Sequence, residues 1–485
     1  MISVVESKAP LLPIESRNTP TTTVQPQMQR SENNVRAWIS RFITVCTLVW
    51  SLYHLYHMIP ASMQGVHVGD EPEEHCHLGQ GLTHHDKSLN YTKRELLHFD
   101  IDSPAYWPIS PSVSITESLN ICHYSYSWNA SGRVRLVTGD PGQQYNFMIG
   151  MQTSGSSQQA IDSVVWPIYS ERNGMYIRCV EFPNMDDTSA DWDATIVLDV
   201  TVFVKPHTLQ FGEFKVGTDV LDIEIAKDLT FETYHMQLFS TRGNIHGNET
   251  VDFTAHEISA HSQNGSITGN WSLPGKIELT TGGWNSLDKP IDIDLIPKMW
   301  SSGPSTQGVI LASTTGGDID IRMPLDHNLS LRNMSINVHS QVGSIRGSLV
   351  TGFDTTLTTL SGSIDVTLLP YFALPDTSTL VTSTAAGHTN ILVLPPIIDS
   401  YYQVNPLTNI KSEHSTTSGK MRLSYPPQWA GAALGLTETG AVGIEGDRFN
   451  MILQEEHLVV ARTDDEIASR LDFSTTTGDG HLVVE

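Results

Sequence analysis

The stretch Ile336–Leu349, INVHSQVGSIRGSL, contains the pattern that decides the fold. Apolar and polar residues alternate over Ile336–Ser340, before a corner at Gly343, and again over Ile345–Leu349 after it. Successive side chains of a β-strand point to opposite faces, so this alternation indicates two short, half-buried strands. The stretch therefore predicts a strand, a tight corner and a second strand.

The same unit recurs from about residue 209 onward. Corners of this kind are Ser240–Ile245, Ser262–Ile267, Thr280–Gly283, Ser313–Ile319 and Leu360–Ile364, with fainter copies at Gly387, Ser415–Gly419, Gly440 and Ser474–Gly478. Successive corner glycines are mostly roughly twenty residues apart, the length of one β-solenoid coil. One coil cannot bury its apolar face alone, so the coils must stack. We expect the glycines to adopt a positive φ and the Ser and Thr hydroxyls to bond the local backbone.

The corner signature Ser/Thr-x-x-Gly-Ser/Asp-Ile-x-Gly/Val resembles a known family. That family is the adhesin-type β-solenoid domain of unknown function, found in bacterial and fungal proteins. The matching segments are Gln263–Gly269, Thr314–Ile321, Gln341–Gly347 and Leu360–Val366. The resemblance covers about 209–429 and continues more weakly to 485. It implies a solenoid with an adhesive role, and it supplies no catalytic residue.

The rest of the 485-residue chain divides into further segments. A chain of this length is expected to form two or three folding units. Residues 104–206 contain strand-like stretches separated by turn-forming residues, which fit either a sandwich-like β domain or the first coils of the solenoid. Residues 209–429 hold the clear repeats, and 430–485 are expected to form terminal β coils or a cap. The predicted fold class is therefore all-β.

An apolar segment at 37–59 is predicted to be a transmembrane helix, because its length suffices to cross a bilayer. It follows a tail, 1–36, that is rich in Pro, Thr, Ser and Gln and predicted to be disordered. Arginines precede the segment and acidic residues follow it, so the positive-inside rule predicts a cytosolic N-terminus and a lumenal or extracellular ectodomain. The protein would then be a single-pass type II membrane protein. The alternatives are a buried helix of a soluble protein and a cleaved signal peptide.

Sequons for N-glycosylation agree with this orientation, because all of them follow the apolar segment. They are Asn90, Asn129, Asn248, Asn264, Asn270, Asn328 and Asn333. Four cysteines are present, and Cys122–Cys179 is the preferred disulfide if that side of the membrane is oxidising. Cys76 would then be free or paired between chains.

Residues 60–103 form a polar, histidine-rich stalk. Imidazole and thiolate ligands suit zinc or copper. The residues concerned are His75, Cys76, His77, His84 and His85. Nothing in the sequence fixes their backbone, so solvated linker histidines are the preferred interpretation. No cofactor is predicted.

No known catalytic motif is present, and the best catalytic candidates are alternating aspartates. They are Asp292, Asp294, Asp318 and Asp320, which stacked coils could bring together. Glycosidases use two carboxyl groups at a defined separation, whereas outward-facing aspartates also keep a sheet soluble. Trp271 and Trp284 near two corners are candidates for stacking on sugars, although a core position is the preferred reading.

Charge limits the partners. The net charge is −25, which disfavours nucleic acid. The sequence therefore favours a membrane-anchored, glycosylated, adhesin-like protein with a non-enzymatic binding or display role toward glycans or surface proteins. The lipid bilayer would be its partner through residues 37–59. The alternatives are a polysaccharide-cleaving β-helix enzyme that uses the aspartate pairs and a structural scaffold of the secretory pathway.

Overall fold

Residues 79–485 form one compact unit. The computed structural model describes residues 89–99, 112–118, 129–162, 164–170, 174–179, 195–206, 210–227, 229–230, 232–248, 254–273, 275–283, 289–297, 307–325, 333–371, 377–398, 405–463 and 469–485. All of these belong to that unit. The predicted tail at 1–36, the predicted transmembrane helix at 37–59 and most of the stalk at 60–103 lie outside the described residues. Within the described ranges, no helix has the length and apolar character needed to span a bilayer.

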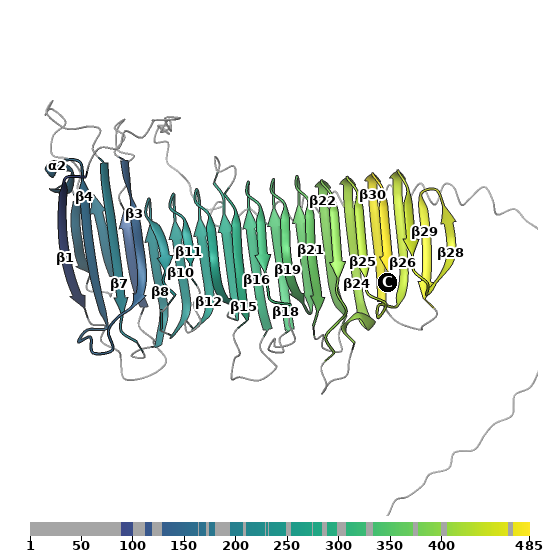
Figure 1. The fold of residues 1–485 in the computed structure, drawn as a ribbon, viewed down its shortest axis with the longest axis horizontal. Helices are drawn as coiled ribbons and strands as arrows, with labels where there is room; N and C mark the ends of the chain where they lie inside the picture. Colours follow the sequence, from purple (N-terminus) through teal and green to yellow (C-terminus); the bar gives the residue numbers. More distant parts are fainter. Residues whose placement is uncertain are drawn as a thin grey trace, which may run out of the picture. The chain divides into compact units, whose positions relative to one another are not determined.

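The described residues form a two-sheet β-solenoid, with sheets of 15 and 16 strands that are parallel through the repeats (Figure 1). Each central coil gives one strand to the 16-stranded sheet and the next to the 15-stranded sheet. In chain order the central coils are β8 (Gln210–Thr218) and β9 (Asp222–Ile225), β10 (Glu232–Ser240) and β11 (Ile245–Gly247), β12 (Thr254–Ser262) and β13 (Ile267–Leu273), β14 (Lys276–Thr281) and β15 (Ile291–Pro297), β16 (Gln307–Thr314) and β17 (Ile319–Arg322), β18 (Asn333–Ser340) and β19 (Ile345–Thr351), β20 (Asp354–Thr359) and β21 (Ile364–Pro370), β22 (Ser378–Ala386) and β23 (Thr389–Val393), and β24 (Ile410–Ser418) and β25 (Met421–Tyr425). The 3₁₀ helix η2 (Pro406–Asn409) precedes β24. The all-β, parallel architecture predicted from the repeat is confirmed.

The alternation seen in the sequence places one side of every strand from β8 to β25 in a single continuous core. The residue that follows each corner stacks on its counterpart in the next coil. In successive coils these residues are Ile223, Ile245, Ile267, Ile291, Ile319, Ile345 and Ile364, each at most 1% exposed. Burying such a side chain contributes about 1.5–3 kcal/mol, so the column stabilises every coil against its neighbours.

Strands within 104–206 belong to the same two sheets as the repeats. They are β2 (Ser112–Ser118), β3 (Asn129–Thr138), β4 (Phe147–Gly155), β5 (Val164–Ser170), β6 (Gly174–Cys179) and β7 (Thr195–Val204), with the short helix α2 (Gln158–Asp162) between β4 and β5. β2 pairs in parallel with β8, and β3 pairs in parallel with β9. Of the two arrangements compatible with the sequence, the strand pairing of the described residues is that of first coils.

The N-terminal end of the stack departs from chain order. The coil of β6 and β7 and the coil of β8 and β9 follow each other in sequence. In space, the coil of β2 and β3 lies between them. The antiparallel strands β1 (Tyr91–Phe99) and β4 extend the 15-stranded sheet, and β5 forms the edge of the other sheet. Antiparallel strands at an end prevent the parallel stack from presenting an open coil for further pairing.

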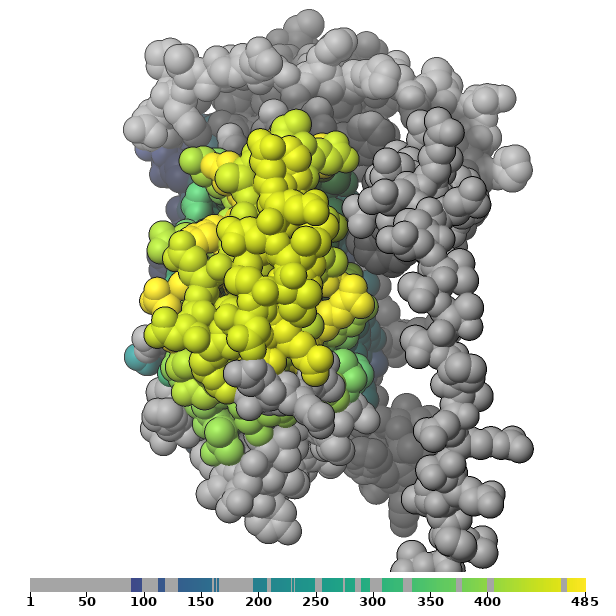
Figure 2. Space-filling model, turned by 90° about the vertical axis from the view of Figure 1, so that its right-hand side faces the viewer, coloured from purple at the N-terminus to yellow at the C-terminus, as the bar shows by residue number. Residues whose placement is uncertain are grey.

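The C-terminal end is built in the same way. Its strands are β26 (Gly431–Thr439), β27 (Val442–Glu445), β28 (Phe449–Glu455), β29 (Leu458–Thr463), β30 (Ser469–Thr477) and β31 (Gly480–Val484). The coil of β30 and β31 lies between the coil of β24 and β25 and the coil of β26 and β27. The hairpin of β28 and β29 adds antiparallel strands beyond β26, and Figure 2 shows this end, where C-terminal residues in yellow form a closely packed surface.

Candidate functional site

A buried column of Ser and Thr hydroxyls lies at the end of each strand that precedes a corner. Its members are stacked coil on coil and are at most 7% exposed: Thr218, Ser240, Ser262, Thr281, Thr314, Ser340, Thr359, Thr384, Thr416, Thr475 and Thr437. We call this set the hydroxyl column. A buried hydroxyl needs hydrogen-bond partners, because burying it without them costs about 1–3 kcal/mol.

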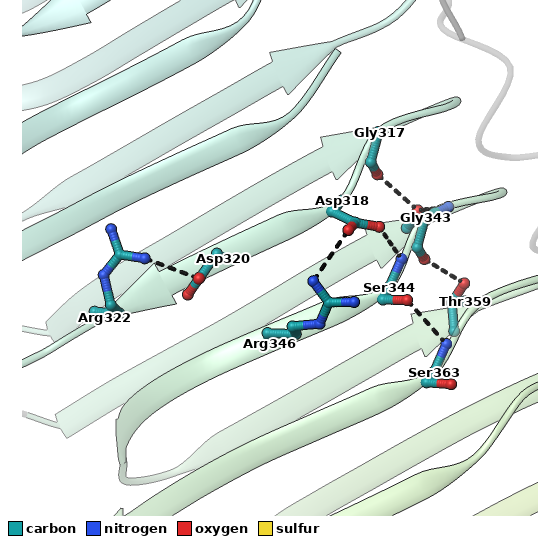
Figure 3. Close-up of polar contacts among 10 residues, drawn as sticks. Gly317, Asp318, Asp320, Arg322, Gly343, Ser344, Arg346, Thr359 and Ser363 are labelled. Atoms are coloured by element: carbon teal, nitrogen blue, oxygen red, sulfur yellow. Dashed lines mark hydrogen bonds and ion pairs between the residues drawn. The ribbon is translucent and has the colours of Figure 1, made fainter. Parts of the chain in front are cut away.

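Ser340 shows how the hydroxyl column is satisfied. Its hydroxyl accepts the backbone N–H of Gly343 at 2.8 Å and donates to the carbonyl of Gly317 in the preceding coil at 3.4 Å. Thr359 in the following coil donates to the carbonyl of Gly343 at 3.0 Å (Figure 3). The hydroxyls of Ser240, Ser262 and Ser340 therefore bond their own corner, as predicted, and also bond the neighbouring corner, which was not predicted.

The corner glycines are required by the close approach of adjacent coils. A Cβ on Gly343 would collide with the carbonyl of Gly317, and a Cβ on Gly362 would collide with the carbonyl of Gly343. The positive φ expected from the sequence is present at Gly419, Gly440 and Gly478, among others, but not at Gly343 or Gly362. At these two corners the physical reason for glycine is contact between coils, so the sequence-based reason was wrong there.

The polar residue after each glycine forms a second ladder between coils. Asp318 Oδ1 accepts the backbone N–H of Ser344 at 2.7 Å, and Ser344 Oγ accepts that of Ser363 at 3.3 Å (Figure 3). Ser363 Oγ in turn accepts the N–H of His388 at 3.2 Å. The Ser/Asp position of the signature therefore supplies an acceptor for a backbone donor of the next coil.

Three of the four candidate aspartates lie together on the outer face of the 15-stranded sheet. Asp292 pairs in register with Asp320, and Asp294 pairs with Arg322. The Arg322 guanidinium contacts the carboxylates of Asp292 at 2.6 Å, Asp294 at 2.6 Å and Asp320 at 2.8 Å. Asp318 lies at the corner and binds Arg346 at 3.2 Å instead.

This geometry describes an ion-pair network centred on Arg322. The hydrogen bond to Asp294 is the main cause of the raised pKa of Arg322. A glycosidase needs one carboxyl group as the acid and another as the base or nucleophile, on either side of a bound sugar. Here the three carboxylates converge on one guanidinium, and their side chains are 36–50% exposed. Arg322 was missed in the sequence, although its position two residues after Asp320 placed it on the same strand face.

The outer face of the 16-stranded sheet carries two stacked aromatic–imidazole pairs on β10 and β12. The ring centroids of Tyr234 and His256 are 5.1 Å apart, and those of Phe239 and His261 are 5.3 Å apart. Tyr234 is 58% exposed, and burial lowers the pKa of His261. We call these four residues the aromatic patch. No residue of this patch was singled out from the sequence, since the pairs form only when the coils stack.

An outward-facing stripe of hydroxyls continues along the same face from the aromatic patch. Its register runs through Thr280, Ser313, His339, Thr358, Ser383, Ser415 and Ser474, so one imidazole interrupts the hydroxyls. Ser313 donates to Thr280 at 3.2 Å, and Ser415 donates to Ser383 at 2.9 Å. The face therefore presents aromatic and imidazole rings beside outward-facing hydroxyls, which can donate and accept hydrogen bonds.

Trp271 is part of the core, as the preferred reading of the sequence held. It is 2% exposed, and its Nε1 donates to the carbonyl of Thr268 at 3.1 Å. Trp284 lies outside the described residues.

The sequons occupy different environments in the described ranges. Asn90 is exposed just before β1, and Asn129 begins β3. The Nδ2 groups of Asn248 and Asn264 donate to Glu224 at 3.4 Å and to the carbonyl of Thr241 at 3.2 Å. Asn270 lies within β13 and Asn333 begins β18, whereas Asn328 is outside the described residues.

The predicted disulfide and metal ligands fall mainly outside the described ranges. Cys179 ends β6, whereas Cys122 is not among the described residues. His75, Cys76, His77, His84 and His85 are also outside them. Among the residues that the structure does describe, no group of three or more His, Cys, Asp or Glu side chains could hold a metal ion.

A fully buried histidine lies between the sheets near the C-terminal end. His414 Nδ1 is 2.8 Å from Thr382 Oγ1, and Nε2 is 3.0 Å from the hydroxyl of Tyr425. Burial lowers the pKa of His414 to about 3 and raises the pKa of Tyr425. The imidazole is therefore neutral near pH 7 and joins the two sheets through hydrogen bonds.

Comparison with known proteins gives little further guidance. No family model matches the chain, and no curated protein matches it. Among solved structures, the chain is similar to that of a candidate cell adhesion protein from Clostridium sporogenes, with 7% identity over 81% of this chain and 100% of that chain. The TM-score is 0.14, so this similarity carries no argument about function.

Proposed function

We propose that this protein is a non-enzymatic, adhesin-like display protein whose solenoid binds glycans or surface proteins through its outer face. The observation that carries the proposal is the aromatic patch beside the outward stripe of hydroxyls. Aromatic faces stack on apolar surfaces of ligands, and a few fixed polar groups orient them. On this face Tyr234 supplies an exposed ring, and Gln237 and Ser259 lie on the same strands.

The polar chemistry of the corners supports a structural role for those residues. Hydroxyls such as Ser340 bond backbone groups of two coils, and Arg322 binds three carboxylates at once. These groups stabilise the stack. Carbohydrate cleavage by the aspartates gains no support from this arrangement, so binding is the function we propose.

Membrane anchoring and N-glycosylation are part of the same proposal. The length of the apolar segment at 37–59, the basic residues before it and the sequons after it all support a type II orientation. Treatment of full-length protein with an N-glycan-removing enzyme should lower its apparent mass, and protease added to intact vesicles should remove only a short tail. An unchanged mass together with digestion of the ectodomain in intact vesicles would contradict this part.

The binding proposal is tested with cells that display the full chain. Binding of labelled glycans and of partner cells should fall at least severalfold in the Tyr234→Ala variant. Phe353→Ala is the matched control, because Phe353 is another exposed aromatic side chain, 42% exposed, away from the aromatic patch. Equal binding by both variants, or no binding by the unaltered chain to any glycan or cell type, would count against the proposal.

A further inference from the structure

The C-terminal coil fills a slot between two coils that are consecutive in sequence. In the 16-stranded sheet the order is β24, β30, β26 (Figure 1), and in the other sheet it is β25, β31, β27. β26 therefore has no hydrogen-bonded contact with β24, and β27 has none with β25. The segment Ser469–Val484, comprising β30 and β31, joins the end of the solenoid to the rest of the stack.

The slot matches this segment closely. Leu471, Phe473 and Leu482 from the segment are buried in the common core. A side chain at Gly435 in β26 would collide with the ring of Phe473, so the glycine leaves the space that the ring occupies. At the corner, Gly478 packs on the carbonyl of Gly419, where a Cβ would collide. The slot therefore selects a segment with this order of apolar, hydroxyl and glycine positions.

Non-covalent contacts hold the segment on both sides. β30 pairs in parallel with β24 and with β26, and β31 pairs in parallel with β25 and with β27. The chain enters the segment from β29 (Leu458–Thr463) through residues 464–468. Because all these contacts are non-covalent, the same segment from another molecule would satisfy them equally well.

We propose that the slot between the β24–β25 coil and the β26–β27 coil accepts the β30–β31 segment of a second copy of this chain, which joins the two copies by exchange. The partner is thus identified by complementarity: it carries its own Phe473 and Gly478 at the required positions. Exchange of an identical element lets two copies associate without a new interface, because each slot is filled by the same side chains as before. This inference does not depend on glycan binding.

The test uses two single-cysteine variants of the full chain with different tags, produced together in the same cells. Ser415 in β24 is in register with Ser474 in β30, and both side chains face outward. One population carries Ser415→Cys and the other Ser474→Cys. A disulfide between differently tagged chains is expected after mild oxidation, because the segment of one copy then lies beside β24 of the other.

Two controls make the result decisive. Thr358→Cys replaces Ser415→Cys in a matched pair, because Thr358 in β20 is in register with Ser383 and not with Ser474. The combination of Thr358→Cys with Ser474→Cys should give no mixed-tag product, although it carries the same native cysteines. A chain with both Ser415→Cys and Ser474→Cys shows whether the two positions can form a disulfide.

A mixed-tag product that appears with Ser415→Cys and not with Thr358→Cys supports exchange. A double variant that closes its disulfide while the mixture gives no mixed-tag product shows that the segment stays in its own chain, and this overturns the proposal. Failure of the double variant to form any disulfide overturns it as well, because the register on which the slot rests would then be incorrect.

Discussion

Removal of the Ser340 hydroxyl should weaken the stack at one coil. In Ser340→Ala, the N–H of Gly343 loses its acceptor at 2.8 Å and the carbonyl of Gly317 loses a donor at 3.4 Å. The serine is fully buried, so water does not replace these bonds in the folded protein. A buried polar group left without a partner costs about 1–3 kcal/mol. We expect a loss near 2 kcal/mol, because the first bond is short and the second is long.

Hydrogen exchange is the suitable measurement for this prediction. In a stack whose coils contact only their neighbours, opening is local and a single global unfolding free energy is not well defined. A loss of about 2 kcal/mol corresponds to roughly 30-fold faster exchange wherever local opening limits it. The acceleration should appear at the Gly343 amide and in the adjacent coils, and it should be absent from β2 and β3.

Two variants act as controls for the same experiment. Ser340→Thr keeps the hydroxyl, and threonine occupies this position in neighbouring coils at Thr314 and Thr359, so exchange should change little. Ser313→Ala removes an outward, half-buried hydroxyl whose bond to Thr280 is 3.2 Å, and it should cost less than about 0.5 kcal/mol. If Ser340→Ala exchanges no faster than Ser313→Ala, the hydroxyl column does not stabilise the corners.

Three further perturbations test other parts of the structure. Gly343→Ala should destabilise its coils by about 1–3 kcal/mol or more, measured as faster hydrogen exchange in the adjacent strands, because its Cβ meets the Gly317 carbonyl. Gly443→Ala should be nearly neutral in the same measurement, since its nearest neighbour is a His481 ring atom at 3.4 Å. Arg322→Ala should cost its coil less than about 1 kcal/mol at low salt, measured by hydrogen exchange, and the loss should shrink at high salt, because the network is half-exposed. A loss that is large and independent of salt would contradict this view. The folded-state pKa of His414 lies below its usual 6.5, so its contribution is fully present above pH 6.5 and is lost as pH falls toward 3, up to about 5 kcal/mol. His414→Gln should flatten the acid side of a thermal stability profile relative to the unaltered chain, and identical profiles would refute the role assigned to burial.

Sequence reasoning predicted the strands and the core because both depend on local alternation. Ile336 and Ile345 could be assigned to the interior from their spacing, and both are at most 1% exposed in the structure. The role of Gly343 was explained incorrectly, because its cause is a carbonyl of another coil about one repeat away. A sequence read along one strand contains no information on distances between coils.

The order of the coils was missed for a related reason. Order in space follows order along the chain from β8 to β25 and departs from it at both ends. Nothing in Ser469–Val484 itself indicates insertion, since its alternation resembles that of every other coil. The complementarity of Phe473 with Gly435 becomes apparent only when the two strands are placed side by side.

In the candidate sites, too, the missed partners come from another coil or from the other sheet. The aspartates were predicted to meet when coils stack, and Asp292 and Asp320 do pair in register. Their shared partner Arg322 determines their chemistry, and it was not considered. His414 stands in a strand rich in Ser and Thr, where no local pattern indicates that Tyr425 from the opposite sheet will accept or donate a hydrogen bond.

The corner signature therefore has a physical meaning that is separate from adhesion. Its Ser or Thr supplies the hydroxyl column, its glycine permits contact between coils, its Ser or Asp accepts a backbone N–H, and its isoleucine fills the core. Each of these positions is explained by stacking alone, so any solenoid built from such coils needs them whatever it binds. A resemblance based on this signature consequently supports the fold and leaves the ligand open. Information on binding must come from positions that the signature leaves free, such as Tyr234 and His256, and substitutions there are the ones that separate a binding face from a solvated one.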